Sequence, residues 1–193
     1  MSAVAPRPDR RSEILATAAR LFARSGYHGV SIDDLGAELG ISGPAIYRYF
    51  AGKEALLAEM LTDISRRLLD GAQRRISAQS DPHARLVALV EFHIDFALTE
   101  PELIAVQFRD LGSLPDRERR LVRSLQRQYV GLWVEVLEQV HPDVGEEQAR
   151  SAAQAVFGLM NSTPYTSRTD EPRLRAQLRA MAEAALAAGC AAP

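Results

Sequence analysis

The sequence predicts an all-α protein with a small N-terminal domain and a larger helical domain. Apolar residues recur at helical spacing along almost the whole chain, and no segment shows the sustained period-two alternation of a half-buried strand. Hydrophobic residues make up 47% of the 193 residues, which is enough to build a core. Turn signals rich in Gly and Pro divide the pattern into about nine helices.

The first helix is expected over residues 10–25. Ile14, Ala18 and Phe22 recur every four residues and share one face, and Gly26 ends the pattern. The preceding residues 1–9 contain Ala, Pro and Arg without an apolar segment, so we expect a disordered arm rather than a signal peptide. Residues 10–52 would then form the smaller domain.

Two short helices joined by a tight turn are predicted within residues 31–50. Ser31 is a typical N-cap residue, and Gly40 stands where a helix C-terminus needs a left-handed residue. Ser42 is expected to cap a second helix over residues 42–50, with Pro44 in its first turn, where a missing N–H has no cost. This pattern indicates a helix-turn-helix, whose second helix enters the major groove of DNA.

The second helix has one face suited to DNA. Ile46 and Phe50 are four residues apart and are expected to face inward, whereas Arg48 is placed to read a guanine. The formal net charge of −2 gives no general attraction to nucleic acid, so positive groups must gather on one face; the candidates are Arg10, Arg11, Arg48 and Lys53. The residues expected to contact DNA are Ser31, Ser42, Gly43, Pro44, Ala45, Tyr47, Arg48, Tyr49 and Lys53.

The larger domain is expected over residues 53–189, followed by a tail of residues 190–193 in which Cys190 is exposed. Residues 146–161 have almost no polar face, which predicts a helix buried on both sides. The predicted helices of this domain cover residues 53–76, residues 82–99, a shorter segment from Pro101, and residues 116–140, 146–161 and 172–188.

The segment YRYFAGKEAL at residues 47–56, the amphipathic helix before it and the turn at residues 26–30 resemble the TetR (tetracycline repressor) family over roughly residues 10–57. Tyr49 stands where His is commoner in this family, and both side chains can donate to a phosphate. The resemblance implies a homodimeric repressor that binds a palindromic operator on double-stranded DNA. It further implies that the repressor is released from DNA by a small molecule bound between the helices of the larger domain.

The resemblance also assigns the last two helices to a four-helix dimer interface. The two apolar faces near the C-terminus support this assignment, because both cannot be buried inside one small domain. The interface residues expected are Ala155, Gly158, Leu159, Leu174, Leu178, Met181 and Ala185.

The effector pocket is expected to be mainly apolar, with a few polar groups that orient the ligand. Such a lining favours a hydrophobic effector. A cluster of arginines between Arg109 and Arg127 could instead hold a long anionic compound such as an acyl-coenzyme A, or could be a solvated face paired with acidic neighbours. The lining residues expected are Leu61, Ile64, Leu68, Leu89, His93, Phe96, Phe108, Tyr129, Leu132, Trp133, Phe157 and Asn161.

No catalytic residues, metal site or cofactor are predicted. No two histidines stand four apart, and no glycine-rich phosphate loop occurs. Glu91 and Asp95 are expected to be solvated, with His93 in the interior. No stretch of about 18 apolar residues suggests a membrane span, and a single cysteine suits the reducing cytoplasm. The alternatives are an activator or dual regulator of the same fold, and an enzyme or adaptor with a vestigial helix-turn-helix.

Overall fold

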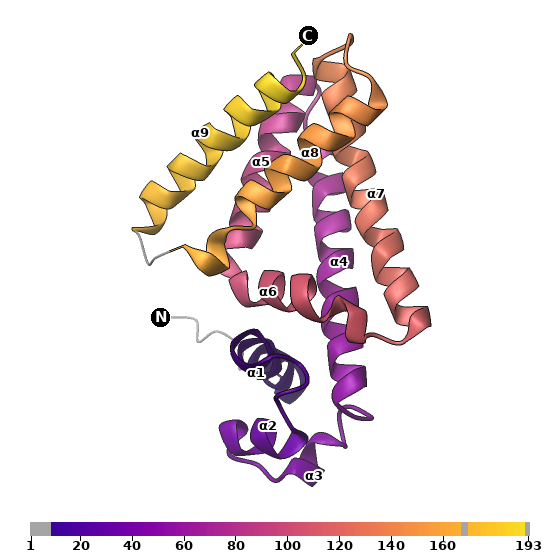
Figure 1. The fold of residues 1–193 in the computed structure, drawn as a ribbon, viewed down its shortest axis with the longest axis vertical. Coiled ribbons are helices and arrows are strands. Elements are labelled where there is room, and N and C mark those ends of the chain that lie inside the picture. Colours follow the sequence, from indigo (N-terminus) through magenta and orange to yellow (C-terminus); the bar gives the residue numbers. More distant parts are fainter. Residues whose placement is uncertain (1–8, 167–169, 192–193) are drawn as a thin grey trace, which may run out of the picture.

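The computed structural model describes residues 9–166 and 170–191 and contains nine α-helices and no strand within them. Three helices form an N-terminal head, and six helices form a larger body (Figure 1). The head consists of α1 (Arg10–Ser25), α2 (Ile32–Leu39) and α3 (Gly43–Ile46). The body consists of α4 (Lys53–Ser77), α5 (Pro82–Thr99), α6 (Pro101–Asp110), α7 (Asp116–Val140), α8 (Glu146–Met160) and α9 (Glu171–Gly189), with short 3₁₀ turns η1 (Leu111–Ser113) and η2 (Thr163–Tyr165).

Helix α4 connects the two parts. It leaves the head and runs up through the body beside α7, while α6 crosses between the head and the rest of the body (Figure 1). Helices α8 and α9 lie together on one side of the body and pack against each other. The all-α architecture and the two-part organisation predicted from the sequence are therefore confirmed.

The first helix begins one residue after a capping carboxylate. Asp9 accepts a hydrogen bond from the backbone N–H of Ser12 at 2.7 Å, and this bond lowers the pKa of Asp9. The sequence placed Asp9 in the disordered arm; the structure instead makes it the N-cap of α1. The rest of the predicted arm, residues 1–8, lies outside the described residues.

The turn between α2 and α3 depends on two glycines. Gly40 adopts the left-handed conformation predicted for it, with φ of 65°. At Gly36, a Cβ atom would lie 2.8 Å from the backbone nitrogen of Gly43 and from the carbonyl oxygen of Ile41. The absence of a side chain at Gly36 lets α2 and α3 approach closely and fixes the angle between them.

The helix α3 is shorter than the sequence predicts. The α-helical assignment ends at Ile46, and residues 47–49 continue as turns. The amide of Tyr49 bonds to the carbonyl of Ile46 at 2.9 Å, three residues back, so the backbone tightens after the first turn. Ser42 occupies the N-cap position of α3 as predicted, although its hydroxyl makes no capping hydrogen bond.

A hydrophobic core is shared by head and body. It includes Phe22 and Ile46 in the head and Leu57, Trp133 and Leu137 in the body. The Cys190 side chain is 6% exposed, and burial raises the pKa of its thiol, so the exposed tail predicted for this residue is corrected. Among the described residues, no helix has the length and apolar character needed to cross a lipid bilayer.

Candidate nucleic-acid interface and ligand pocket

The α3 region presents three consecutive exposed side chains, Tyr47, Arg48 and Tyr49. Ile46 and Phe50 on either side of them are 0% and 3% exposed, as the sequence predicts, and they hold this segment to the head. The exposed side chains are therefore supported by a rigid base. Aromatic hydroxyls and a guanidinium are groups that bind phosphate oxygens and base edges.

Three of the four cations predicted for the DNA face make contacts with other groups of the same chain. Arg10 pairs with Glu13 at 2.8 Å, and Arg11 pairs with Glu59 while its guanidinium lies 4.3 Å from the Phe50 ring centroid. The Lys53 ammonium donates to the carbonyl oxygens of Tyr27 and Val30 at 2.8 and 2.7 Å.

Arg48, by contrast, makes no hydrogen bond or ion pair with another described side chain, so its guanidinium is available for DNA. The Lys53 ammonium joins the turn before α2 to the first residue of α4, which leaves one of its three N–H groups for a phosphate.

The other residues predicted to contact DNA divide into two groups. Ser42 and Pro44 are exposed, and Ala45 is half-buried, beside Arg48. Ser31 forms a capping box with Asp34, in which its hydroxyl accepts from the Asp34 amide at 3.0 Å. Gly43 is buried, and a Cβ atom there would lie 2.0 Å from an Asp33 carboxylate oxygen. The contacts of Ser31 and Gly43 thus shape the head, and the direct DNA contact predicted for the buried Gly43 is corrected.

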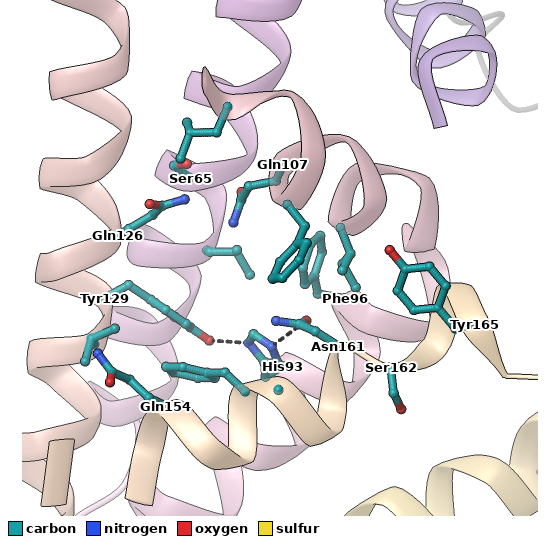
Figure 2. A pocket seen from close by; sticks show the side chains of 17 residues that line it. Ser65, His93, Phe96, Gln107, Gln126, Tyr129, Gln154, Asn161, Ser162 and Tyr165 are labelled. Carbon is teal, nitrogen blue, oxygen red and sulfur yellow. Dashed lines mark hydrogen bonds between the residues drawn. The ribbon is translucent and has the colours of Figure 1, made fainter. Parts of the chain in front are cut away.

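The body contains a cavity of about 680 Å³ between α4, α5, α6, α7 and α8 (Figure 2). This volume is within the range of about 300–1,000 Å³ that is usual for small-molecule sites. The lining residues are Ser65, Leu68, His93, Phe96, Ile104, Gln107, Phe108, Leu111, Gln126, Tyr129, Val130, Gln154, Phe157, Gly158, Asn161, Ser162 and Tyr165.

The sequence located part of this lining. The predicted residues that line the cavity are Leu68, His93, Phe96, Phe108, Tyr129, Phe157 and Asn161. Leu61, Ile64, Leu89 and Trp133 are instead buried core residues, and Leu132 is partly buried against the same core. Periodicity identified the inward faces of the helices, but it did not separate side chains that fill the core from those that border a space.

Several polar lining residues were missed, among them Gln107, Gln126 and Gln154. For Gln126, the sequence contained a spacing that would have placed it in the lining. It stands four residues after Val122 and three before Tyr129, and both of these are buried on α7. A polar residue within an apolar stripe at helical spacing marks a lined cavity or a buried hydrogen bond.

A hydrogen-bonded chain of three side chains crosses one end of the cavity. The Nδ1 atom of His93 lies 3.0 Å from the Tyr129 hydroxyl, and its Nε2 atom lies 3.1 Å from Oδ1 of Asn161 (Figure 2). Burial lowers the pKa of His93 to about 4, so the imidazole is neutral at physiological pH. Because Oδ1 can only accept, Nε2 carries the proton and Nδ1 accepts from Tyr129.

The aromatic rings around His93 hold it in place. Its ring centroid lies 4.9 Å from that of Phe157 and 5.8 Å from that of Phe96. At the opening of the cavity, Phe108 and Tyr165 are 88% and 75% exposed. A ligand that entered here would cover apolar surface that otherwise faces water.

The charged residues singled out from the sequence lie away from this lining. Glu91 pairs with Arg179 at 2.6 Å, and Asp95 pairs with Arg175, so these carboxylates hold α9 to α5 rather than remaining only solvated. In the part of the chain that the structure describes, no group of three or more His, Cys, Asp or Glu side chains could hold a metal ion.

The arginine cluster near residue 112 is divided. Arg109 bonds the carbonyl oxygens of Phe22 and Ala23 at the end of α1 and pairs with Asp110 at 3.2 Å. Arg119 pairs with Asp116. The exposed members on α7 are Arg117, Arg120, Arg123 and Arg127, and none of them lines the cavity. Of the two alternatives left open for this cluster, pairing with acidic neighbours is the one that the structure shows for Arg109 and Arg119.

The residues predicted for a dimer interface are only partly accessible. Ala155 and Gly158 on α8 and Met181 on α9 are exposed, and Leu159, Leu174 and Ala185 are half-buried. Leu178 is 4% exposed inside the protomer, so its assignment to the interface is corrected. Gly158 also borders the cavity. The exposed face of α8 also carries polar side chains such as Gln148, Ser151 and Gln154, so the prediction that this helix is buried on both sides is corrected for the protomer.

Comparison with known proteins gives the class of this protein. A family model described as bacterial regulatory proteins of the tetR family matches residues 14–60, and one described as a tetracyclin repressor-like C-terminal domain matches residues 79–165. The HTH-type transcriptional regulator BetI of Vibrio vulnificus is 35% identical over 164 residues, covering 79% of this chain and 77% of that protein. The chain belongs to the TetR family of DNA-binding transcriptional regulators, which are not enzymes.

Two further matches define the extent of the similarity. The HTH-type transcriptional activator FasR of Mycolicibacterium smegmatis is 32% identical over 91 residues. This segment spans less than half of either protein, 47% of this chain and 42% of FasR. The crystal structure of a TetR-family regulator from Bordetella parapertussis superposes with a TM-score of 0.81 at 26% identity, covering 94% of each chain. Head and body together therefore follow the family fold.

The buried His93 predicts a pH dependence of stability. Its pKa is about 4 in the folded protein and 6.5 for an unperturbed histidine, so the unfolded chain binds more protons between these values. The free energy of unfolding should therefore fall as the pH drops from about 6.5 to 4, by an amount on the order of 3 kcal/mol from this group. Urea titrations across this pH range measure the effect.

The control uses two glutamine substitutions. His93→Gln keeps one donor and one acceptor without a titrating group and should flatten the pH dependence, whereas His83→Gln changes an exposed histidine and should leave it unaltered. Equal slopes for the wild type and His93→Gln would contradict the prediction.

Proposed function

We propose that this regulator is a homodimeric repressor that binds a palindromic operator through the α3 region and is released by a small hydrophobic effector bound in the cavity. The observation that carries the proposal is that the two helices joining head and body, α4 and α6, also line the cavity. A ligand can release DNA only if it binds the DNA-incompetent arrangement more tightly than the competent one. Shared helices give the ligand a physical means of doing so.

Helix α4 provides the first connection. Lys53 at its start is bonded to the turn before α2, and Ser65 and Leu68, three to four turns later, line the cavity. A ligand that displaces these later turns would tilt the helix and move the head.

Helix α6 provides a second connection. Gln107 and Phe108 line the cavity, and the next residue, Arg109, bonds the last carbonyls of α1. A cation at a helix C-terminus is favoured by the helix dipole, so Arg109 acts as a clamp between α6 and the head. A shift of α6 by the ligand would pull on this clamp.

The names of relatives support a repressor that responds to a small molecule. The HTH-type transcriptional repressor KstR2 of Rhodococcus jostii is 28% identical over 159 residues, 82% of this chain. A structural neighbour with a TM-score of 0.74, AibR, was solved in complex with isovaleryl coenzyme A and operator DNA. The match to the activator FasR covers less of this chain. Transcription from a promoter carrying the operator, with and without the protein, distinguishes repression from activation.

Operator binding tests the assignment of the α3 region. With an operator selected from a random-sequence duplex pool, Arg48→Ala should weaken binding by about 1–3 kcal/mol and relax specificity at one base pair of each half-site, since a bidentate arginine contact to guanine is lost. Arg24→Ala removes the same charge from α1 and should leave base preference intact. An unchanged base preference in Arg48→Ala would contradict the assignment.

The Arg109 clamp gives a second prediction. Arg109→Met keeps the apolar stem but removes the hydrogen bonds to α1 and the ion pair with Asp110, so the head should sample more orientations. Operator binding should weaken by about 1 kcal/mol, roughly fivefold, as measured by titration against the same duplex. Arg117→Met, an exposed arginine of α7, is the matched control. An equal loss in both variants would show that only general charge matters.

Dimerisation is tested at the exposed face of α9. Met181 is 46% exposed in the protomer, and Met181→Arg should dissociate the dimer and reduce operator binding, because two heads must sit about 34–36 Å apart on one side of the duplex. Leu121→Arg, at a 39% exposed leucine of α7, should leave the assembly intact. Sedimentation that shows a wild-type monomer at micromolar concentration would refute the dimer.

A further inference from the structure

The wall of the cavity, as far as the described residues form it, carries no charged side chain. Among the described residues that line it, none is Asp, Glu, Lys or Arg, although 25% of the chain is charged. The cations that the sequence offered for an anionic ligand lie elsewhere: Arg109 bonds α1, and Arg120 and Arg123 are exposed without lining the cavity. The described wall of the cavity therefore combines apolar side chains with neutral polar ones and has no ionised side chain.

The histidine on the wall does not change this. His93 is 3% exposed, and burial keeps its imidazole neutral at physiological pH. Both of its ring nitrogens are engaged, with Tyr129 and with Asn161. It therefore positions its two neighbours and offers no positive charge to a ligand.

Amide groups supply the polar contacts that remain free. Gln107, Gln126 and Gln154 line the cavity and make no hydrogen bond with another described side chain or backbone group. Figure 2 shows Gln107 and Gln126 near Ser65 at one end of the cavity and Gln154 near Tyr129 at the other. Each amide can donate two hydrogen bonds and accept others, so it suits a neutral oxygen.

Asn161 adds a donor at the histidine end. Its Oδ1 atom accepts from His93, which leaves the Nδ2 group free to donate. A ligand carbonyl oxygen could accept from Nδ2, while a hydroxyl could bond to any of the glutamine amides. The aromatic and aliphatic side chains between the two ends, such as Phe96 and Ile104, would cover the apolar part of the ligand.

Resting on the proposed function, we infer that the effector is an uncharged, largely apolar molecule with ketone, ester, lactone or hydroxyl oxygens, and that the pocket amides select it against an anion of the same size. An ionised carboxylate inside this cavity would lose its hydration without gaining a cation partner, which is far more costly than burying a neutral oxygen that accepts a hydrogen bond from an amide.

The first experiment compares two probes that differ in charge. Isothermal titration of the wild-type protein at neutral pH with methyl octanoate and with octanoate should show at least about tenfold tighter binding of the ester. Octanoyl-coenzyme A serves as the third probe. Tighter binding of this thioester than of the ester, lost in an Arg120→Ala, Arg123→Ala double variant, would overturn the inference in favour of an anionic ligand.

The second experiment introduces a positive charge to reverse the preference between the ester and the carboxylate. Gln126→Lys places a cation on the cavity wall and should favour octanoate over the ester by about tenfold relative to wild type. Gln128→Lys, two residues further on the same helix and exposed outside the cavity, is the matched control and should retain the wild-type preference. Thermal unfolding of each variant shows whether the folded protein is being compared.

Three further outcomes would overturn the inference: equal or tighter binding of octanoate by wild type, no binding of the ester, or the same shift in both lysine variants. The titrations use protein without DNA, so they are independent of the proposed function. If the wild-type protein bound no operator from the duplex pool, the proposed repressor function would be refuted. The measured preference between ester and carboxylate would still stand.

Discussion

The continuity of α4 is the constraint on which the rest of the structure depends. This helix has 25 residues, so at about 1.5 Å per residue it spans close to 40 Å without a break. Its first residue, Lys53, is bonded to two carbonyls of the turn before α2, and its middle turns pack against α5 and α7. In the proposed function, α4 would move as a rigid body, so a displacement at the cavity would be transmitted to the head instead of being absorbed.

Helix α6 restricts the same movement from a second direction. Arg109 bonds the end of α1 from outside the core, and its partner Asp110 is 4% exposed. A buried carboxylate needs its cation, so this pair keeps Arg109 directed toward α1. The head is thus attached at two points, the start of α4 and the end of α6, and both helices continue into the wall of the cavity. Two attachments fix the orientation of the head relative to the body, whereas a single hinge would let the head rotate.

The chemistry of the cavity follows from the way its polar groups are satisfied. The Tyr129–His93–Asn161 chain has a fixed direction because the imidazole is neutral and Oδ1 of Asn161 can only accept. The unpaired glutamine amides can rotate to meet a ligand, whereas this chain is held by surrounding aromatic rings. The pocket therefore combines a rigid polar end with adaptable polar groups, and hydrogen bonding rather than charge would decide specificity.

The sequence by itself determined the helices and the helix-turn-helix, because periodicity, caps and glycines are local signals: Ser31, Gly40 and the inward pair Ile46 and Phe50 are placed as predicted. Only the tertiary structure decided which inward residues border a space, since Trp133 and Phe157 have the same apolar character but one fills the core and the other lines the cavity. It also decided that Arg11, Lys53 and Arg109, which the sequence offered for ligands, bond groups of this chain that lie 23 or more residues away. A local pattern records the type of a side chain, whereas its contacts depend on residues brought together by folding.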